Sequence, residues 1–381
     1  MKILHIVENL HRGAVETWLV RMFEASCELR PADEWTFYCA LGESGRHDER
    51  VRQLGGRIIY SPVPFRRTMS FLRALRRTLK NGHFDVLHCH HDLLSGFYLL
   101  AALGLPIRQR VVHVHNTDEA LPTPSKFKHR ILKEPLRKTC LGLSGKVVGI
   151  SKHTLQSFLH GRKPRGGRDE VLYYGCDFSA WLRERLDLTL LRNNLGFPSD
   201  TRIVLFMGRL DPVKNPIGAL NIFAALYRRR NDVACLFAGE GNLADEILEQ
   251  ANRLGLSNRV RLFGWCETPS ALMQACDLFL FPRLENNVEG FGLTVLEAQA
   301  AGLPVLTSYG VSEEVLVFPE RCRQLPITES PEVWAGAADE LLETTRPNRQ
   351  IILLTLQDTP FSREAGARNL LALYESGCYC P

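Results

Sequence analysis

Short apolar runs alternate along this chain with segments whose apolar residues recur every three or four positions. Segments such as Met1–Val7 and Thr201–Met207 are mostly apolar, without polar residues at alternate positions, which is typical of strands covered on both faces of a sheet. Segments such as Phe65–Lys80 and Phe361–Ser376 instead carry their apolar residues on one helical stripe. This alternation predicts α/β domains built on parallel, doubly wound sheets.

The length of 381 residues predicts two domains of ordinary size. We expect the first domain at residues 1–180, the second at 195–355, and a C-terminal helical segment at 356–381. Further strands are expected at Trp35–Leu41, Arg57–Tyr60, Asp85–His90, Arg110–His115, Lys146–Ser151, Val233–Ala238, Arg259–Phe263, Leu278–Phe281 and Pro304–Thr307, and further helices at Glu16–Ala25, Lys126–Lys138 and Leu293–Ala301.

The stretch Asp277–Ser308 combines a strand, a turn with glycines, a helix and a second strand. The first amide groups of a helix lack intrahelical partners and carry the positive end of the helix dipole, so they bind anions. Gly290 and Gly292 let a phosphate or a sugar approach the backbone closely. Two carboxylates, Glu289 and Glu297, flank this helix start at a separation of roughly 10 Å. That separation suits two groups that hold opposite ends of a nucleotide sugar.

The segment E-G-F-G-L-T-V-L-E-A-Q-A-A-G-L-P-V, which begins at Glu289, resembles the signature of the family-4 retaining glycosyltransferases. The resemblance implies the GT-B fold, in which two Rossmann-like domains face each other across a cleft and a C-terminal helix returns to the first domain. It also implies that Glu289 contacts the donor sugar and Glu297 the ribose. The alternative, two surface acids on an ordinary helix, does not explain the glycines. Further donor contacts are implied for Gly290, Phe291, Gly292, Leu293 and Thr294.

The run G-R-L-D-P-V-K-N from Gly208 to Asn215 resembles the diphosphate-binding motif of the same family. Arg209 would offer a fork of donors to phosphate oxygens, and Lys214 a mobile point charge. The alternative is a solvent-exposed pair of cations in a turn. The sequence has no Asp-x-Asp with metal-ligand surroundings. We therefore expect a metal-independent reaction in which the basic pair replaces a divalent ion, and no cofactor besides the nucleotide-sugar substrate.

Two motifs of the first domain also resemble the family. The loop G-A-V-E, which starts at Gly13, matches a G-G-A-E loop near the donor phosphates, with Ala14 in place of the second glycine. His115 ends an H-x-H-N pattern and matches a histidine that reaches the donor sugar and acceptor, where a neutral imidazole would hydrogen-bond a sugar hydroxyl. The alternative is a structural histidine. His90 is a weaker candidate, and a zinc site through His88–His91 lacks a spaced partner pair.

The loop that starts at Gly239 supplies a competing hypothesis. With Gly241 and Ala244 it forms G-x-G-x-x-A, formally a dinucleotide fingerprint, which favours an NAD(P)-dependent oxidoreductase. The next strand, however, does not end in the acidic residue expected to bind a ribose. The family resemblance instead implies a donor-side role for this loop, and it places the nucleobase near Trp265. Tyr174 replaces the Asn of the family's N-G-x-D signature.

The charge is unevenly distributed. Residues 1–180 carry 28 Lys and Arg against 17 Asp and Glu, whereas the remainder carries 19 against 25. A basic first half favours an anionic acceptor or an anionic membrane surface, and the basic segment Phe65–Lys80 is either a membrane-surface helix or a sheet-covering helix with a solvated face. The absence of a nucleic-acid motif argues against nucleic acid. Scattered cysteines and a start untypical of a signal peptide lead us to expect a cytoplasmic protein, peripheral on the inner face of the membrane.

The residues together predict a retaining, metal-independent hexosyltransferase that moves a sugar from a nucleotide sugar to a glycan or lipid-linked acceptor in polysaccharide biosynthesis. Arg209, Lys214, Glu289 and His115 are the expected catalytic residues, and Gly208 and Gly241 are expected to contact the donor as well. Besides the oxidoreductase, a non-catalytic binding protein of the same fold remains an alternative.

Overall fold

The protein is described by a computed structural model that covers residues 1–11, 13–117, 126–178, 181, 192–198, 200–286 and 288–376, with side chains from residue 131 onward in the helix that begins at Lys126. The chain forms two compact units. The first unit is Met1–Asp177 together with Thr359–Pro381, and the second is Phe178–Asp358. Every helix in the described part is too short or too polar to cross a bilayer.

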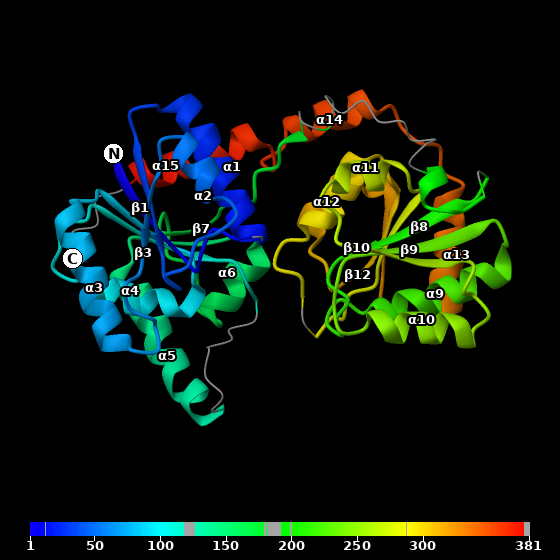
Figure 1. The fold of residues 1–381 in the computed structure, drawn as a ribbon, viewed down its shortest axis with the longest axis horizontal. Coiled ribbons are helices and arrows are strands. Elements are labelled where there is room, and N and C mark those ends of the chain that lie inside the picture. Colours follow the sequence, from blue (N-terminus) through cyan, green and yellow to red (C-terminus); the bar gives the residue numbers. More distant parts are fainter. Residues whose placement is uncertain are drawn as a thin grey trace. The chain divides into compact units, whose positions relative to one another are not determined.

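The first unit is built on a seven-stranded sheet in which all neighbouring strands are parallel (Figure 1). The strand order is β3-β2-β1-β4-β5-β6-β7, so the chain reverses its direction of travel between β1 and β4. Ligands of open α/β sheets bind at such a switch point, beyond the carboxyl ends of the strands. Its elements are β1 (Lys2–Val7), α1 (Ala14–Leu29), β2 (Glu34–Cys39), α2 (Asp48–Gln53), β3 (Arg57–Tyr60), α3 (Thr68–Gly82), β4 (Val86–Cys89), η1 (Asp92–Leu94), α4 (Ser95–Ala101), β5 (Gln109–Val114), α5 (Lys126–Leu143), β6 (Lys146–Gly149), α6 (Lys152–Leu159), β7 (Asp169–Val171) and α15 (Arg363–Glu375).

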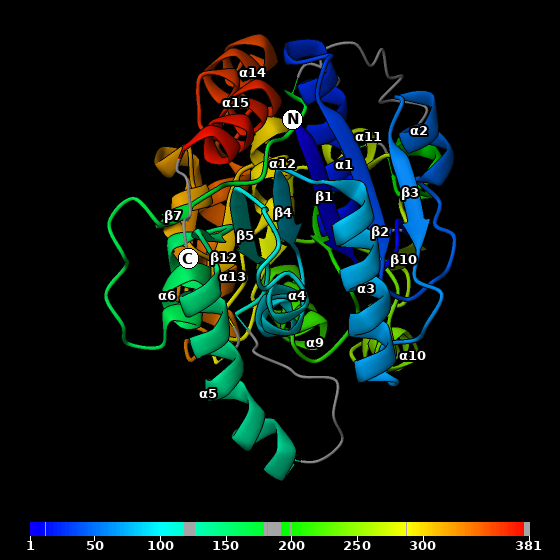
Figure 2. The same ribbon diagram turned by 90° about the vertical axis from the view of Figure 1, so that its left-hand side faces the viewer.

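The two faces of this sheet differ in chemistry. One face of the sheet is covered by α3 and α4 (Figure 2). Apolar side chains such as Phe71 and Tyr98 pack on this face. The other face packs on α1 and the C-terminal helix α15, and it carries a set of buried histidines. The helix α15 returns to this unit through a backbone hydrogen bond from the Arg363 amide to the Cys176 carbonyl (2.8 Å). The return of the C-terminal helix to the first unit agrees with the fold that the sequence predicted.

The second unit has a six-stranded parallel sheet of the same design, with the order β10-β9-β8-β11-β12-β13. Its switch point lies between β8 and β11, which are hydrogen-bonded neighbours. Its elements are β8 (Arg202–Met207), α9 (Pro216–Arg229), β9 (Val233–Ala238), α10 (Ala244–Arg253), β10 (Val260–Gly264), α11 (Pro269–Gln274), β11 (Leu278–Phe281), α12 (Leu293–Ala300), β12 (Val305–Ser308), η2 (Glu313–Val315), η3 (Pro319–Arg321), β13 (Cys322–Leu325), α13 (Pro331–Leu342) and α14 (Arg349–Gln357).

Most predicted elements occur within one to four residues of their expected ends. The helix predicted at Lys126–Lys138 is longer than expected and takes part in the core. It continues to Leu143 as α5, and Leu136 and Cys140 on its later turns are buried in the first unit. The basic segment at residues 65–80 covers the sheet, because Phe71 is fully buried while Arg73 and Arg77 are exposed.

Candidate active site

The charged loops of the second unit gather at its switch point. The loop after β8 carries Lys214, and the segment after β11 carries Arg283 and Glu289. The Lys214 Nζ atom lies 2.5 Å from Oε2 of Glu289, and Nη1 of Arg283 lies 2.6 Å from the same oxygen. The carboxylate of Glu289 is thus held between two cations that come from different loops.

Burial makes this cluster electrostatically strong. The side chain of Arg283 is 7% exposed, and those of Lys214 and Glu289 are 15% and 20% exposed. Burial lowers the pKa of Lys214, and the negative charge of Glu289 acts in the opposite direction. Burial likewise lowers the pKa of Arg283, again against the influence of Glu289. Two cations around one carboxylate leave an excess of positive charge, which favours an anionic ligand.

Asn215 fixes the position of Lys214. It adopts a left-handed backbone conformation (φ 58°) that asparagine tolerates better than most residues, and it is the N-cap of α9. Its Oδ1 accepts from the Gly218 amide (3.1 Å), while its Nδ2 donates to the Pro282 carbonyl (2.8 Å) just after β11. One side chain therefore ties the loop after β8 to the loop after β11, and so brings Lys214 to Glu289.

The N-terminus of α12 lies beside this cluster. Gly292 is its N-cap with φ 93°, a conformation that favours glycine, and no side chain caps this end of the helix within the described residues. A Cβ atom built on Gly292 would lie 3.9 Å from Cγ of Glu289. The Phe291 side chain is buried, whereas Gly290, Leu293 and Thr294 are half-buried. An uncapped helix start next to excess positive charge is an anion-binding arrangement.

Arg209 occupies the outer part of the same loop. Its side chain is 74% exposed and lies 3.1 Å from Asp211, so it is free to turn toward a ligand at small cost. Its charge is close enough to Lys214 and to Arg283 to lower the pKa of both. The structure therefore brings Arg209, Lys214 and Glu289 together at one end of the sheet.

The glycines after β9 are used for packing between loops. A Cβ at Gly239, where φ is 138°, would lie 1.9 Å from the Gly208 carbonyl oxygen, and a Cβ at Gly241 would lie 2.2 Å from the Leu210 carbonyl oxygen. These glycines let the loop after β9 lie against the loop that carries Arg209. Their presence is explained without a dinucleotide, and this removes the main support for the oxidoreductase hypothesis.

The two remaining predicted donor residues lie on neighbouring elements of the second unit. Trp265 follows β10 and is half exposed. Burial raises the pKa of the Cys266 thiol, and the negative charge of Glu297, on the second turn of α12, adds to this effect. The Trp265–Cys266 segment and Glu297 are therefore close to each other, as a nucleoside-binding pair would be.

In the first unit, Gly13 is the N-cap of α1 and Ala14 is its first residue. A Cβ at Gly13 would lie 2.0 Å from Oε2 of Glu16, so the glycine makes room for this carboxylate at the helix start. Burial raises the pKa of Glu16. The neighbouring Arg12 lies outside the described residues.

His115 is buried and both of its ring nitrogens are engaged within the first unit. Nδ1 lies 2.7 Å from the Tyr174 hydroxyl, and Nε2 lies 3.0 Å from Nδ1 of His90. Burial lowers the pKa of His115 to about 3, so its imidazole is neutral at neutral pH. The expectation of a neutral imidazole agrees with this, but a contact with a sugar hydroxyl would have to replace one existing hydrogen bond. The role of His115 in the reaction stays a prediction.

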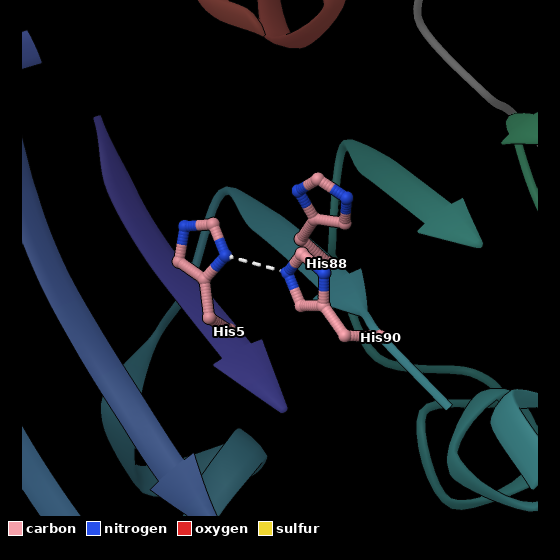
Figure 3. Close-up of side chains that lie close together, drawn as sticks. All are labelled: His5, His88 and His90. Atoms are coloured by element: carbon pink, nitrogen blue, oxygen red, sulfur yellow. Dashed lines mark hydrogen bonds between the residues drawn. The ribbon is translucent and has the colours of Figure 1, made fainter. Parts of the chain in front are cut away.

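Histidines of the first unit also form the groups that could hold a metal ion. In the part of the chain that the structure describes, two sets of three have ring nitrogens within 4.8 Å of one another. Figure 3 shows one set, His5, His88 and His90, on adjacent strands, with the hydrogen bond between His5 and His90. The other set is His90, His113 and His115.

Sequence reasoning missed three residues of these arrangements. Arg283 gave no signal, because a lone arginine after a strand is common, and only its burial against Glu289 distinguishes it. Asn215 belongs to the motif after β8, but its link to the loop after β11 is visible only in the structure. Tyr174 departs from the family pattern, and this departure is the signal that could indicate its contact with His115.

Two family models match the chain. Residues 20–179 match the model described as "Glycosyltransferase Family 4", and residues 188–352 match "Glycosyl transferases group 1". The Bacillus subtilis protein provisionally named glycosyltransferase EpsF is 27% identical over 377 residues, which cover 98% of this chain and 96% of that protein. A D-inositol 3-phosphate glycosyltransferase of Mycobacterium bovis is 30% identical over 274 residues, 68% of this chain and 54% of that protein.

Solved structures share the fold. The crystal structure of HepE from Anabaena in complex with UDP has a TM-score of 0.79 at 20% identity, and the match covers 99% of this chain and 100% of that one. A second crystal structure of HepE, in complex with UDP-glucose, has a TM-score of 0.77 at 19% identity, with coverage of 99% and 100%.

Proposed function

Because this chain belongs to the family-4 glycosyltransferases and has their GT-B fold, we propose that it moves a sugar from a nucleotide sugar to a glycan or lipid-linked acceptor, with retention of configuration and without a metal ion. The chain is a glycosyltransferase of polysaccharide or glycan biosynthesis. The proposal adds the donor class, the stereochemistry and the residues that act.

One observation carries the proposal: the carboxylate of Glu289 lies between the cations of Lys214 and Arg283, beside the uncapped start of α12. A diphosphate and a carboxylate are both anions that accept from these donors. When a nucleotide sugar binds, its diphosphate would take the α12 amides and Lys214 as partners. Arg283 would then keep Glu289 in place to accept a hydrogen bond from a sugar hydroxyl.

Bond breaking at the sugar leaves negative charge on the departing diphosphate. Lys214 and the amides near Gly292 would stabilise that charge, because they are held in place before the reaction begins. The exposed Arg209 would turn toward the same charge. This cationic set would do the work that a divalent ion does in other transferases, which supports a metal-independent reaction. The half-buried Glu297 would hold the ribose hydroxyls, and Trp265 would lie near the base.

Uridine diphosphate sugars are the first donors to test, since the similar fold of HepE binds UDP and UDP-glucose. The basic charge of the first unit supports an anionic acceptor. For a lipid-linked acceptor, we propose that the protein acts at the anionic inner surface of the membrane. The exposed arginines of α3, such as Arg73 and Arg77, would contribute electrostatic attraction only, because the apolar side of this helix is used in the core.

The experiment is a thermal-shift screen of nucleotide sugars, followed by mass analysis of the products with candidate acceptors. We expect a uridine diphosphate sugar to raise the melting temperature and to lose its sugar to an acceptor or to water, with no added metal and with chelator present. A protein that binds no nucleotide sugar, or one whose turnover disappears with chelator, would contradict the proposal.

A further inference from the structure

Five buried histidines occupy one face of the sheet of the first unit. His5 is on β1, and His88 and His113 are on β4 and β5; His90 and His115 follow two residues after the latter pair and so share their face. The rings of His88 and His90 stack with centroids 4.2 Å apart, as do those of His113 and His115. The strand order β1-β4-β5 places these rings next to one another. Figure 3 shows those of His5, His88 and His90.

Hydrogen bonds between strands join three of the rings into a series that we call the His115 chain. It begins at the Tyr174 hydroxyl, which lies 2.7 Å from Nδ1 of His115. Nε2 of His115 lies 3.0 Å from Nδ1 of His90, and Nε2 of His90 lies 3.0 Å from Nδ1 of His5. Both ring nitrogens of His115 and of His90 are therefore used.

A second series, the His88 chain, runs beside the first. It begins at the Tyr374 hydroxyl on α15, which lies 2.8 Å from Nδ1 of His88. Nε2 of His88 lies 3.1 Å from Nδ1 of His113, whose Nε2 has no partner among the described residues. The two chains are linked by a hydrogen bond between the Tyr374 hydroxyl and Nε2 of His5, which is 3.5 Å long and therefore weak.

The proton positions in each chain depend on one another. The imidazoles are neutral, since burial lowers the pKa of His5 and of His115 to about 3 and holds those of the other three well below the ordinary value. A neutral imidazole has one donor and one acceptor nitrogen. Once one ring nitrogen accepts a hydrogen bond, the other nitrogen must donate, and the next ring must accept at the nitrogen that faces it. Each chain therefore allows two arrangements of protons only: all its rings carry the proton on Nε2, or all carry it on Nδ1.

The tyrosine hydroxyls determine which of the two proton arrangements forms. A phenol is a better donor than acceptor, and the bare nitrogen of a neutral imidazole is a strong acceptor. Each chain begins with a tyrosine hydroxyl at an Nδ1 atom, of His115 in one and of His88 in the other. If both hydroxyls donate, all the rings carry their proton on Nε2. His113, the last ring of the His88 chain, packs edge to face with Trp18, with ring centroids 5.0 Å apart.

We propose that the tyrosines impose the Nε2–H tautomer on the histidines of both chains, and that His90 and His5 are positioning residues that hold His115 in this tautomer. Its catalytic consequence rests on the proposed function. Nε2 of His115 donates its hydrogen bond to His90, so a substrate can bind the ring only at Nδ1. In this tautomer Nδ1 accepts a hydrogen bond. A substrate hydroxyl at His115 would thus take the place of the Tyr174 hydroxyl and would donate its proton to the ring.

A metal site in the same cluster is less well supported. A metal ion needs three lone pairs that converge on one point about 2.0–2.1 Å from each nitrogen. Here Nδ1 of His5 and Nε2 of His90 point at each other across 3.0 Å, with room for one proton between them. Both candidate sets consist of neutral, buried imidazoles, so a divalent ion would bring an uncompensated charge into the core. Metal binding is therefore one outcome of the test.

The test reads the tautomers directly, by two-dimensional NMR of the full chain labelled with ¹⁵N-histidine and without substrate. His5→Phe keeps a ring on Trp35, with which His5 stacks at 4.5 Å, but removes the acceptor of the His90 Nε2–H group. His5→Asn places an amide oxygen near the position of Nδ1 and restores that acceptor. His88→Phe is the matched control, since it interrupts the other chain with a change of the same kind.

We expect His115 to be the Nε2–H tautomer in the wild type, in His5→Asn and in His88→Phe. In His5→Phe we expect a second tautomer of His115 to appear in the spectra. We also expect kcat to fall by about tenfold with an unchanged KM for the donor, because one hydrogen bond to the substrate is lost. An Nδ1–H tautomer of His115 in the wild type, an unchanged tautomer in His5→Phe, or a stoichiometric transition metal in the purified protein would overturn the proposal. Since the spectra need no substrate, absence of sugar transfer would refute the proposed function alone.

Discussion

The Nζ atom of Lys214 lies 2.5 Å from Oε2 of Glu289, a residue 75 positions further along the chain. Both residues follow strands, β8 and β11, that are neighbours in the sheet although two other strands separate them in sequence. The contact joins a residue expected to bind phosphate to one expected to bind sugar. The cation that we expect to bind the diphosphate is therefore paired with a carboxylate of the protein itself.

Replacement of Lys214 by alanine should raise the activation barrier by about 2–4 kcal/mol and so lower kcat. This is the usual effect of removing a group that stabilises transition-state charge. Arg209→Ala should act in the same direction. The measurement is the steady-state rate with the donor found by the screen. Arg228→Ala is a suitable control, because it removes a cation of the same unit that is 61% exposed and pairs with Glu332. Turnover near the wild-type value in both Lys214→Ala and Arg209→Ala would exclude the proposed roles.

The activity should fall at alkaline pH earlier in the Glu289→Gln variant than in the wild type. Burial lowers the pKa of Lys214, and the charge of Glu289 opposes this effect. Lysine is charged below its pKa, so removing the opposing charge lets Lys214 become neutral at a lower pH. A profile of kcat/KM against pH, which reports on the free enzyme, should show its alkaline limb shifted to lower pH. Limbs that coincide would show that Lys214 is not the titrating group.

Substitution of Gly239 by alanine should destabilise the second unit by about 3 kcal/mol or more, because the new methyl group would overlap the Gly208 carbonyl oxygen and φ is 138°. Gly336→Ala provides the comparison. This glycine lies inside α13 with open space around it, so the substitution should stabilise the protein by about 0.5–1 kcal/mol. Urea unfolding of both variants measures the difference. A tolerated Gly239→Ala would mean that the loop packing does not require glycine.

The first unit should lose stability as the pH falls below about 6.5. In the unfolded chain His5 and His115 bind protons near that pH, whereas in the folded chain their pKa is about 3. The unfolded state therefore binds more protons between these values, and each residue lowers the free energy of unfolding by up to about 1.4 kcal/mol per pH unit. Urea midpoints between pH 7 and pH 5 measure the slope. His5→Phe should make it shallower, and His11→Gln, at an exposed position, should not.

Much of the fold follows from local patterns. Successive apolar residues from Ile203 to Met207 are typical of a short strand covered on both faces, and β8 occupies this segment. The position of Gly292 before an apolar stripe predicts a helix start, and α12 begins at the next residue. These signals depend on neighbours in sequence, so they can be recognised without knowledge of the third dimension.

The sequence by itself determined that charged and glycine-bearing loops follow the strands, because strand ends and helix starts have local signatures. Only the tertiary structure decided which loops meet. Strand order brings together segments that are far apart in the chain, and burial leaves each polar atom in need of a partner. Because both act on the whole unit at once, Arg283 contacts Glu289 and Tyr174 contacts His115.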